Sequence, residues 1–157
     1  MYTSDLNQTI IPYIARTAKM IHLHLSDKLK QYKFDLTRAQ WVVLKRLHDE
    51  DGQIQNNLAL ITDRNKTSLT RLIHTMERKE LVVRISDEQD KRINRIYLTE
   101  KGKAIYQQTL PIIYGSLTKM QSSLSEEEIE QLIFLLKKMY SGVEALQNEE
   151  KICSASN

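Results

Sequence analysis

The sequence predicts a mainly α-helical fold with one small β-hairpin, and three observations support this expectation. The chain has four Gly and two Pro among 157 residues, too few for the many tight turns of a β-sandwich or barrel. Apolar residues recur every three or four positions, as they do on one face of a helix. A hydrophobic content of 41% in a chain of this length can supply the core of one folded domain, residues 1–157.

A long apolar stripe predicts a first helix over about residues 10–32. Pro12 falls in the first turn of this helix if Thr9 is the N-cap, and a missing N–H removes no helical hydrogen bond at that position. We therefore expect the helix to begin directly after Thr9.

A second helix is marked by Thr37 and Gln40, which have the spacing of a capping box. In that motif each side chain binds the orphan backbone amide of the other residue. Asp51 and Gly52 are expected to end the helix, and residues 53–54 are long enough only for a short edge strand.

Two short helices in close succession predict a helix-turn-helix. Residues 55–62 form the first, the break at 62–65 interrupts the apolar period, and Asn65 is a good N-cap for the second, residues 66–79. The apolar face of the second helix holds Leu69, Leu72, Ile73 and Met76. Its opposite face holds Lys66, Thr67, Thr70, Arg71, His74 and Arg78. Basic and hydroxyl groups on the outward face of such a helix are typical of DNA binding.

A β-hairpin is predicted after these helices. Residues 81–85 and 93–98 are rich in β-branched side chains and flank the polar stretch 86–92. The hairpin carries the cations Arg84, Lys91, Arg92 and Arg95. We therefore expect it to project positive charge beside the second helix of the pair.

Two further helices complete the predicted fold. Thr99 caps a helix over about residues 100–121, which Pro111 should kink because its ring clashes with the carbonyl group one turn earlier. Residues 125–128 form a second capping box and open the last helix. Residues 148–157 are expected to form an irregular tail.

The charge of the chain is concentrated in its middle. Residues 64–103 hold 11 basic and 6 acidic residues, a net charge of +5, whereas residues 121–157 hold 3 basic and 7 acidic residues. Such a basic segment between near-neutral and acidic ends suggests a localised nucleic-acid footprint, and a solvated charged surface is the alternative.

Several classes of protein are disfavoured by what the sequence lacks. It contains no nucleophile beside a base, no phosphate-binding Gly loop and no metal motif, so an enzyme is not expected. A single cysteine, Cys153, cannot build a disulfide framework. No long apolar run and no signal-peptide pattern appear, so we expect a soluble, cytoplasmic protein.

Six short segments carry a family pattern. They are Leu36-Thr37-x-x-Gln40-Trp41-x-Val43-Leu44, Leu58-Ala59, Lys66-Thr67-Ser68-Leu69-Thr70-Arg71-Leu72-Ile73, Arg78-Lys79-x-Leu81-Val82-x-Arg84, Asp90-Lys91-Arg92 and Leu98-Thr99-Glu100-Lys101-Gly102. In this order, and followed by Leu124-Ser125-x-Glu127-Glu128, they resemble the MarR family of transcriptional regulators. The resemblance covers about residues 9–146.

The resemblance implies a homodimeric winged helix-turn-helix protein. Its DNA-binding lobe would span residues 36–103, with a recognition helix at 66–79 and a wing at 85–94. The terminal helices, within 9–35 and 104–147, would form the dimer. The lobe would bind palindromic double-stranded DNA, and a small molecule, often a phenolic or aromatic acid, would regulate it.

The sequence departs from the family pattern at two points. A Gly commonly precedes the first wing strand, and Glu80 stands there, so this helix must end without the residue that adopts a left-handed conformation easily. No cysteine occupies an N-terminal sensing position, so a thiol-based peroxide sensor is not supported.

The expected DNA contacts on the recognition helix are of two kinds. Arg71 can bond a guanine bidentately, and the hydroxyl groups of Thr67 and Thr70 can reach bases or phosphates. Lys66 and Arg78 should bind phosphates, which adds affinity without sequence preference. The full expected set is Lys66, Thr67, Ser68, Thr70, Arg71, His74 and Arg78.

The wing supplies further candidates. Asp90 can hold the guanidinium group of Arg92, which would then enter a minor groove, with Lys91 beside it. A surface salt bridge is the alternative for this pair. Arg84 and Arg95, at the base of the wing, are expected either to bind phosphates or to pack within the protein.

An effector site is expected between the dimer helices and the DNA-binding lobe, and its candidate lining is His22, Leu25, Trp41 and Lys45. Trp41 is more simply a core residue. The histidines include no His-x-x-x-His pair and have no companion cysteine, so no metal site or cofactor is expected.

The sequence therefore predicts a sequence-specific DNA-binding regulator, most simply a ligand-responsive repressor. Two alternatives stay open. One is a winged-helix module that binds proteins without specific DNA binding, since fold does not fix function. The other is a regulator that responds to a metal ion.

Overall fold

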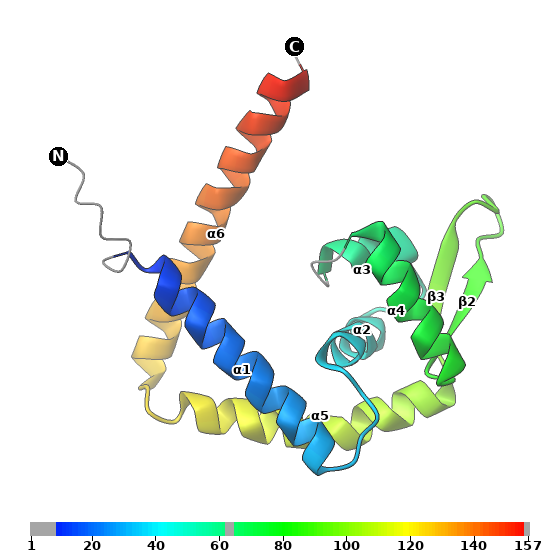
Figure 1. Ribbon diagram of the computed structural model, residues 1–157, viewed down its shortest axis with the longest axis horizontal. Helices are drawn as coiled ribbons and strands as arrows, with labels where there is room; N and C mark the ends of the chain where they lie inside the picture. Colours follow the sequence, from blue (N-terminus) through cyan, green and yellow to red (C-terminus); the bar gives the residue numbers. More distant parts are fainter. Residues whose placement is uncertain (1–8, 62–64, 156–157) are drawn as a thin grey trace. The chain divides into compact units, whose positions relative to one another are not determined.

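The computed structural model describes residues 9–61 and 65–155, without the side chains of residues 60–61 and 150–155. The chain forms two compact units, residues 1–115 and 116–157. Its elements are α1 (Ile11–Gln31), α2 (Arg38–Asp49), β1 (Gln53–Ile54), α3 (Gln55–Ile61), α4 (Lys66–Arg78), β2 (Val82–Ser86), β3 (Asn94–Leu98), α5 (Glu100–Gln121) and α6 (Glu126–Ala155) (Figure 1). The mainly α-helical fold with a small β-hairpin is confirmed. No helix in the described ranges is long and apolar enough to cross a bilayer.

The helix starts predicted from capping residues are confirmed at three places. Thr37 Oγ1 accepts the Gln40 N–H at 3.2 Å, and Gln40 Oε1 accepts the Thr37 N–H at 3.0 Å. Asn65 Oδ1 accepts the Ser68 N–H at 2.9 Å and so caps α4. Ser125 and Glu128 form the same reciprocal pair at the start of α6. These short-range bonds satisfy amides that have no partner inside the helix.

Two expectations about helix ends are wrong. The N-cap of α1 is Ile10, not Thr9, and it makes no side-chain cap bond. Ile10 already has helical backbone angles, φ −74° and ψ −17°. The tail expected from residue 148 is helical to Ala155, because residues 148–155 contain no Gly or Pro to stop an established helix.

α5 continues through Pro111 to Gln121, and the kink expected there stays a prediction.

The core of the first unit lies between α2, α3, α4 and the sheet. The four residues predicted to form the apolar face of α4 are all buried. Trp41 is partly buried and packs against this core, as expected of a core residue. The core cluster is Val43, Leu44, Leu47, Leu58, Leu69, Leu72, Ile73, Met76, Leu81, Val82, Ile96, Leu98 and Tyr106.

The sheet has three antiparallel strands in the order β1-β3-β2. β2 and β3 form the predicted hairpin, with Val82 opposite Leu98 and Ser86 opposite Asn94. The two-residue strand β1 pairs with β3 at the other edge, as the sequence indicated. Asp51 Oδ1 fixes the turn before β1, because it accepts the Leu98 N–H at 2.9 Å.

Glu80 ends α4 in the conformation that the family pattern assigns to Gly. Its φ is +59°, in the left-handed region that disfavours residues with a Cβ atom. The Glu80 N–H donates to Glu77 O at 2.8 Å, and the Leu81 N–H donates to Met76 O at 3.0 Å. These two bonds form a Schellman motif, and Met76 and Leu81 complete it within the core. Tertiary packing therefore imposes a strained backbone on Glu80.

Gly102 lies in the first turn of α5 directly against the backbone of Leu81. A Cβ atom built on Gly102 would lie 2.1 Å from the Leu81 carbonyl oxygen. The same oxygen accepts the Thr99 N–H at 3.2 Å, and the Thr99 hydroxyl donates to Glu80 O at 2.6 Å. Only Gly therefore permits α5 to start this close to the end of α4.

We predict that Gly102→Ala destabilises the protein by about 3 kcal/mol or more, the upper range for overpacking, because backbone must move to admit the methyl group. Gly115→Ala is the matched control, since a Cβ atom there would meet nothing within 4 Å. That change should stabilise the helix by up to about 1 kcal/mol. Urea unfolding of both variants measures the difference, and equal stabilities would contradict the packing described here.

Candidate nucleic-acid interface

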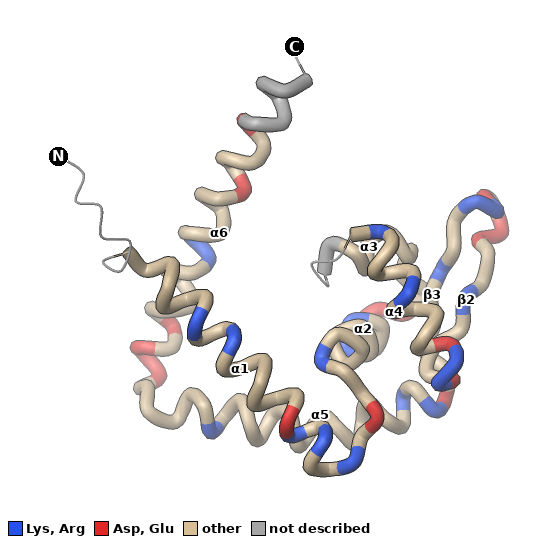
Figure 2. Tube along the Cα trace, in the orientation of Figure 1, with Lys and Arg blue, Asp and Glu red and all other residues tan. Residues whose placement is uncertain are grey.

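The outward face of α4 presents a row of exposed polar side chains. Asn65 caps the helix and the buried apolar face fixes its rotation, so the opposite residues must face solvent. Exposed on this face are Lys66, Thr67, Thr70, Arg71, His74 and Arg78, and Ser68 at its edge is half-buried. Figure 2 shows that the α4 helix and the wing both carry basic residues. Every residue predicted on this face of the recognition helix is thus accessible to a partner.

Thr70 has only part of its hydrogen-bonding capacity free. Its hydroxyl donates to Lys66 O at 2.9 Å and accepts from Gln55 Nε2 at 3.1 Å. A hydroxyl group has one proton and two lone pairs, so one acceptor position is left. Thr70 is therefore arranged to accept a hydrogen bond, as from a base amino group. Gln55, at the start of α3, is a contributor that sequence reasoning missed.

Arg71 shares a hollow with Arg38, the first residue of α2. The hollow has a volume of about 660 Å³ and also includes Ser26, Thr37 and Thr75. Both arginines are exposed, and neither is in an ion pair with another of the described residues. Arg38 was missed because it lies inside a capping box and served only to locate a helix start. Its exposure beside Arg71 adds a cation to this surface.

The wing is less positive than its sequence indicates. Arg84 Nη2 lies 3.1 Å from Glu77 Oε2, which links β2 to α4. Arg95 Nε donates to Asp87 Oδ2 at 2.5 Å, and its Nη1 donates to Gly52 O at 3.2 Å. Of the four wing cations, these two are therefore engaged within the protein. For Arg84 and Arg95 the geometry favours the packing alternative over phosphate binding.

The expected contact between Asp90 and the Arg92 guanidinium is wrong. Asp90 Oδ1 instead accepts the backbone N–H of Arg92 at 2.9 Å. The two residues are only two positions apart in a tight turn, where a short acidic side chain reaches the backbone more easily than a long side chain. Lys91 and Arg92 are exposed at the tip, and within the described ranges neither side chain forms an ion pair.

Asp87 organises the turn of the wing. Its Oδ1 accepts the N–H groups of Gln89 and Asp90 at 2.9 and 3.2 Å, while Oδ2 binds Arg95. The Arg95 guanidinium, followed by these two backbone bonds, lowers the pKa of Asp87 from 3.8 to about 2. The Asp87 carboxylate therefore links the wing turn to the start of β3 and, through Arg95, to the turn before β1.

The four candidate effector residues are in different environments. Trp41 Nε1–H donates to the buried Thr109 Oγ1 at 2.9 Å, and Lys45 pairs with Asp49 at 2.6 Å. His22 and Leu25 are half-buried on α1. Burial, and then the charge of Arg38, lower the pKa of His22. Among the described residues, no group of three or more His, Cys, Asp or Glu side chains could hold a metal ion.

The chain is similar to known transcriptional regulators in sequence and fold. A model of the MarR family matches residues 36–93. The chain is 32% identical over 121 residues to the uncharacterized HTH-type transcriptional regulator YybA of Bacillus subtilis (strain 168). This alignment covers 75% of this chain and 81% of YybA. The complex of S. aureus MepR with DNA matches with a TM-score of 0.79 and 31% identity, over 86% of this chain and 98% of that chain. AbsC, a MarR family transcriptional regulator from Streptomyces coelicolor, shares the fold with a TM-score of 0.82 and 23% identity, over 92% of this chain and 99% of that chain.

We predict that Asp87 stays ionised in the folded protein down to a pH of about 2. Because the pKa is lower in the folded state than in the unfolded chain, this carboxylate favours folding above about pH 4. That contribution is lost as the pH falls from there through 2. A carbon-13 NMR titration of the Asp87 carboxyl group measures the pKa directly.

Unfolding measurements provide the second arm of this test. The difference in stability between the wild type and Asp87→Asn should shrink as the pH falls below 4, whereas Glu88→Gln, an exposed neighbour, should show little difference at any pH. Titration of Asp87 at its ordinary pKa would contradict the hydrogen bonding described for the wing.

Proposed function

The chain belongs to the MarR family of DNA-binding transcriptional regulators, and from that premise we propose that it represses transcription as a homodimer bound to a specific palindromic operator. It is a regulator, not an enzyme. The outward face of α4 carries the proposal, because exposed basic and hydroxyl groups lie opposite a fully buried apolar face. The similar protein MepR forms a crystallised complex with DNA, which supports DNA binding by this chain.

In this proposal α4 enters a major groove. Arg71 bonds a guanine, and Thr67 and Thr70 contact neighbouring base edges, with Thr70 acting as an acceptor. Lys66 and Arg78 bind phosphates. The same helix also offers Ser68 and His74 at the edges of the contact.

The wing enters the flanking minor groove through Lys91 and Arg92, the two cations at its tip that form no ion pair with the described residues. Arg38, exposed beside Arg71, binds a phosphate from the start of α2. Arg84 and Arg95 position the wing through their carboxylate partners rather than contacting DNA themselves. The DNA-contacting cations are thus fewer than the basic residues of the lobe.

Exposed apolar side chains on the terminal helices support a homodimer. A monomeric protein seldom presents long apolar stripes to water, whereas a two-fold interface buries them. On α1 and its start the exposed residues are Ile10, Ile11, Tyr13, Met20 and Leu23. On α6 they are Leu132, Ile133, Phe134, Leu135, Leu136, Tyr140, Val143 and Leu146. We propose that these two helices of each subunit pair with those of a second copy.

A dimer of this kind sets the distance between its two recognition helices. A ligand can change that distance. Half-sites one helical turn apart, about 10 base pairs centre to centre, would match the dimer. A small aromatic or phenolic acid that binds better to the dimer with a different spacing would release the operator. We propose that the protein acts in the cytoplasm, because a transcriptional regulator must reach its promoter DNA.

We predict that selection on a random duplex library enriches a palindrome. Binding to the selected palindrome should weaken steeply as salt rises, because each phosphate contact releases counterions. Arg71→Ala should cost about 1–3 kcal/mol of binding free energy and relax the base preference at one position of each half-site. Lys66→Ala is the matched control, since loss of a phosphate contact should weaken all sequences about equally. Titrations of the selected and scrambled duplexes at several salt concentrations measure both effects.

Two outcomes would contradict this assignment. If Arg71→Ala retains both affinity and base preference, α4 does not bind in the major groove as proposed. Weak binding that does not depend on salt, without an enriched sequence, would favour a protein-interaction module instead.

We also predict that Ile133→Glu disrupts the dimer, because it introduces a charge into the apolar stripe of α6. Light scattering should show a monomer at concentrations at which the wild type is a dimer, and affinity for the palindrome should fall at least tenfold as the second half-site is lost. Lys138→Glu changes the charge at a position of the same helix that is already charged and exposed, so it should leave the dimer intact. A dimeric Ile133→Glu protein would exclude this stripe from the interface.

A further inference from the structure

The Thr70 hydroxyl group, on the outward face of α4, has its proton engaged inside the protein. It donates to Lys66 O at 2.9 Å, one turn earlier on the same helix, and it accepts from Gln55 Nε2 at 3.1 Å. Thr67 lies three positions earlier on the same exposed face, and its hydroxyl group bonds no other described residue. The Thr67 hydroxyl can therefore donate or accept, whereas that of Thr70 can only accept.

Gln55 reaches Thr70 from a different helix. It is the first residue of α3, which packs against α4. Its Nε2 atom bonds Thr70, and its Oε1 atom is buried without a hydrogen-bond partner among the described residues. A buried acceptor without a partner costs stability, so the stability of the fold does not explain Gln55 at this position. The bond to Thr70 is what this side-chain amide contributes.

The Thr70 proton stays inside the protein whichever way the Gln55 amide faces. Rotation of the amide by half a turn would bring Oε1 to Thr70, and the hydroxyl would then donate to Gln55 instead of Lys66. A buried amide nitrogen would take the place of the buried oxygen. In both arrangements the protein uses the one proton, and the hydroxyl offers only lone pairs to a partner on the exposed side.

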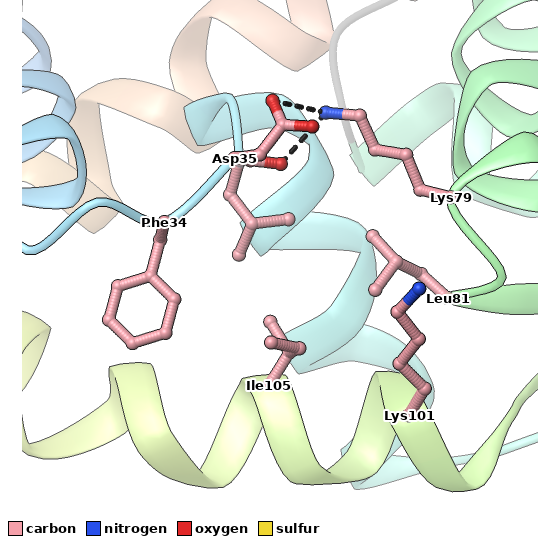
Figure 3. A pocket seen from close by; sticks show the side chains of 7 residues that line it. Phe34, Asp35, Lys79, Leu81, Lys101 and Ile105 are labelled. Carbon is pink, nitrogen blue, oxygen red and sulfur yellow. Dashed lines mark hydrogen bonds and ion pairs between the residues drawn. The ribbon is translucent and has the colours of Figure 1, made fainter.

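α4 is held at both ends, so Thr70 presents its hydroxyl group from a fixed place. Asn65 caps the first turn. Directly after the helix, Lys79 Nζ lies 2.7 Å from Asp35 O and 2.9 Å from Asp35 Oδ1 (Figure 3). It also donates to Gln40 Oε1 at 3.3 Å. These bonds join the end of α4 to the chain segment at the start of α2.

We propose that Gln55 is a positioning residue that determines base specificity: it holds Thr70 as an acceptor, so that Thr70 selects a base with an amino group in the major groove. This inference rests on the proposed function and deepens it. Adenine N6 and cytosine N4 are amino donors on the major-groove edge, whereas guanine and thymine present acceptors there. The operator should therefore carry adenine or cytosine opposite Thr70 in each half-site.

The test compares operator selection by the full-length wild type and by two variants. Thr70→Val removes the hydroxyl group but keeps the shape of the side chain, so a preference for the thymine methyl group would survive it. Affinity for the selected palindrome should fall about 3- to 10-fold, and the preference for adenine or cytosine should disappear at one position of each half-site. Gln55→Met keeps the length of the side chain and removes its hydrogen bond. Because the Thr70 hydroxyl can then rotate and donate, guanine and thymine should be accepted at the same position.

Base analogues test the contact from the DNA side. Purine in place of adenine, or 2-pyrimidinone in place of cytosine, lacks only the amino group. This replacement opposite Thr70 should weaken binding of the wild type by the same factor as Thr70→Val does. It should not weaken binding of Thr70→Val further, because the contact is already lost in that variant.

Matched variants and the protein without DNA provide the controls. Asn56→Ala changes an exposed neighbour on α3 and should leave this base preference unchanged. In the protein without DNA, the NMR signals of the Gln55 side-chain amide should shift in Thr70→Val and not in Thr67→Val. Circular dichroism checks the fold of each variant, and Gln55→Ala replaces Gln55→Met if the latter does not fold.

Two kinds of failure are distinguishable. The inference alone is overturned by an enriched palindrome with guanine or thymine at this position, or by a preference for adenine or cytosine that the Thr70 and Gln55 variants retain. Unshifted Gln55 amide signals in Thr70→Val overturn it without DNA. The absence of any enriched palindrome overturns the proposed function, and this inference with it.

Discussion

The contact between Gly102 and the Leu81 carbonyl oxygen determines how the DNA-binding lobe is assembled. Leu81 lies between α4 and the wing, and Thr99 lies between the wing and α5. The Thr99 hydroxyl joins the two chain segments, since it donates to Glu80 O and accepts the Gly102 N–H at 3.0 Å. The end of α4, the wing and the start of α5 therefore meet at this contact. Any side chain at position 102 would separate the recognition helix from the helix that leads to the second unit.

Ion pairs hold the wing on this framework. Arg84 connects β2 to α4 through Glu77, and Arg95 connects the wing turn to the loop before β1 through Asp87 and Gly52. Arg84, in the middle of the hairpin, restricts its angle to the recognition helix, and Arg95, next to the hairpin turn, ties that turn to the loop before β1. Lys91 and Arg92 at the tip provide positive charge. Arg84 and Arg95 thus position the wing, whereas Lys91 and Arg92 give its tip a positive charge.

Much of the fold could be predicted because its signals are local. The capping boxes at Thr37 and Ser125 and the apolar face of α4 depend on residues three or four positions apart. The pairing of Arg84 with Glu77 and of Arg95 with Asp87 could not be predicted, because it depends on strand register and on side-chain direction. Arg38, which the sequence marked only as part of a capping box, lies beside Arg71 through the tertiary packing of α2 against α4. For the site, sequence identified the exposed helix face but overestimated the charge of the wing.

The left-handed Glu80 has an evolutionary consequence. A non-glycine residue in this conformation costs about 1–2 kcal/mol, and every Glu codon becomes a Gly codon by a single-base change. The strain is therefore retained although a more permissive residue is one mutational step away. Natural proteins are held above a threshold of stability and not at its maximum, so such strain can persist without being purged. A mutation of Glu80 to Gly would relieve this strain and stabilise the lobe. Such a gain in stability would offset destabilising substitutions among the DNA-facing residues as operator preference evolves.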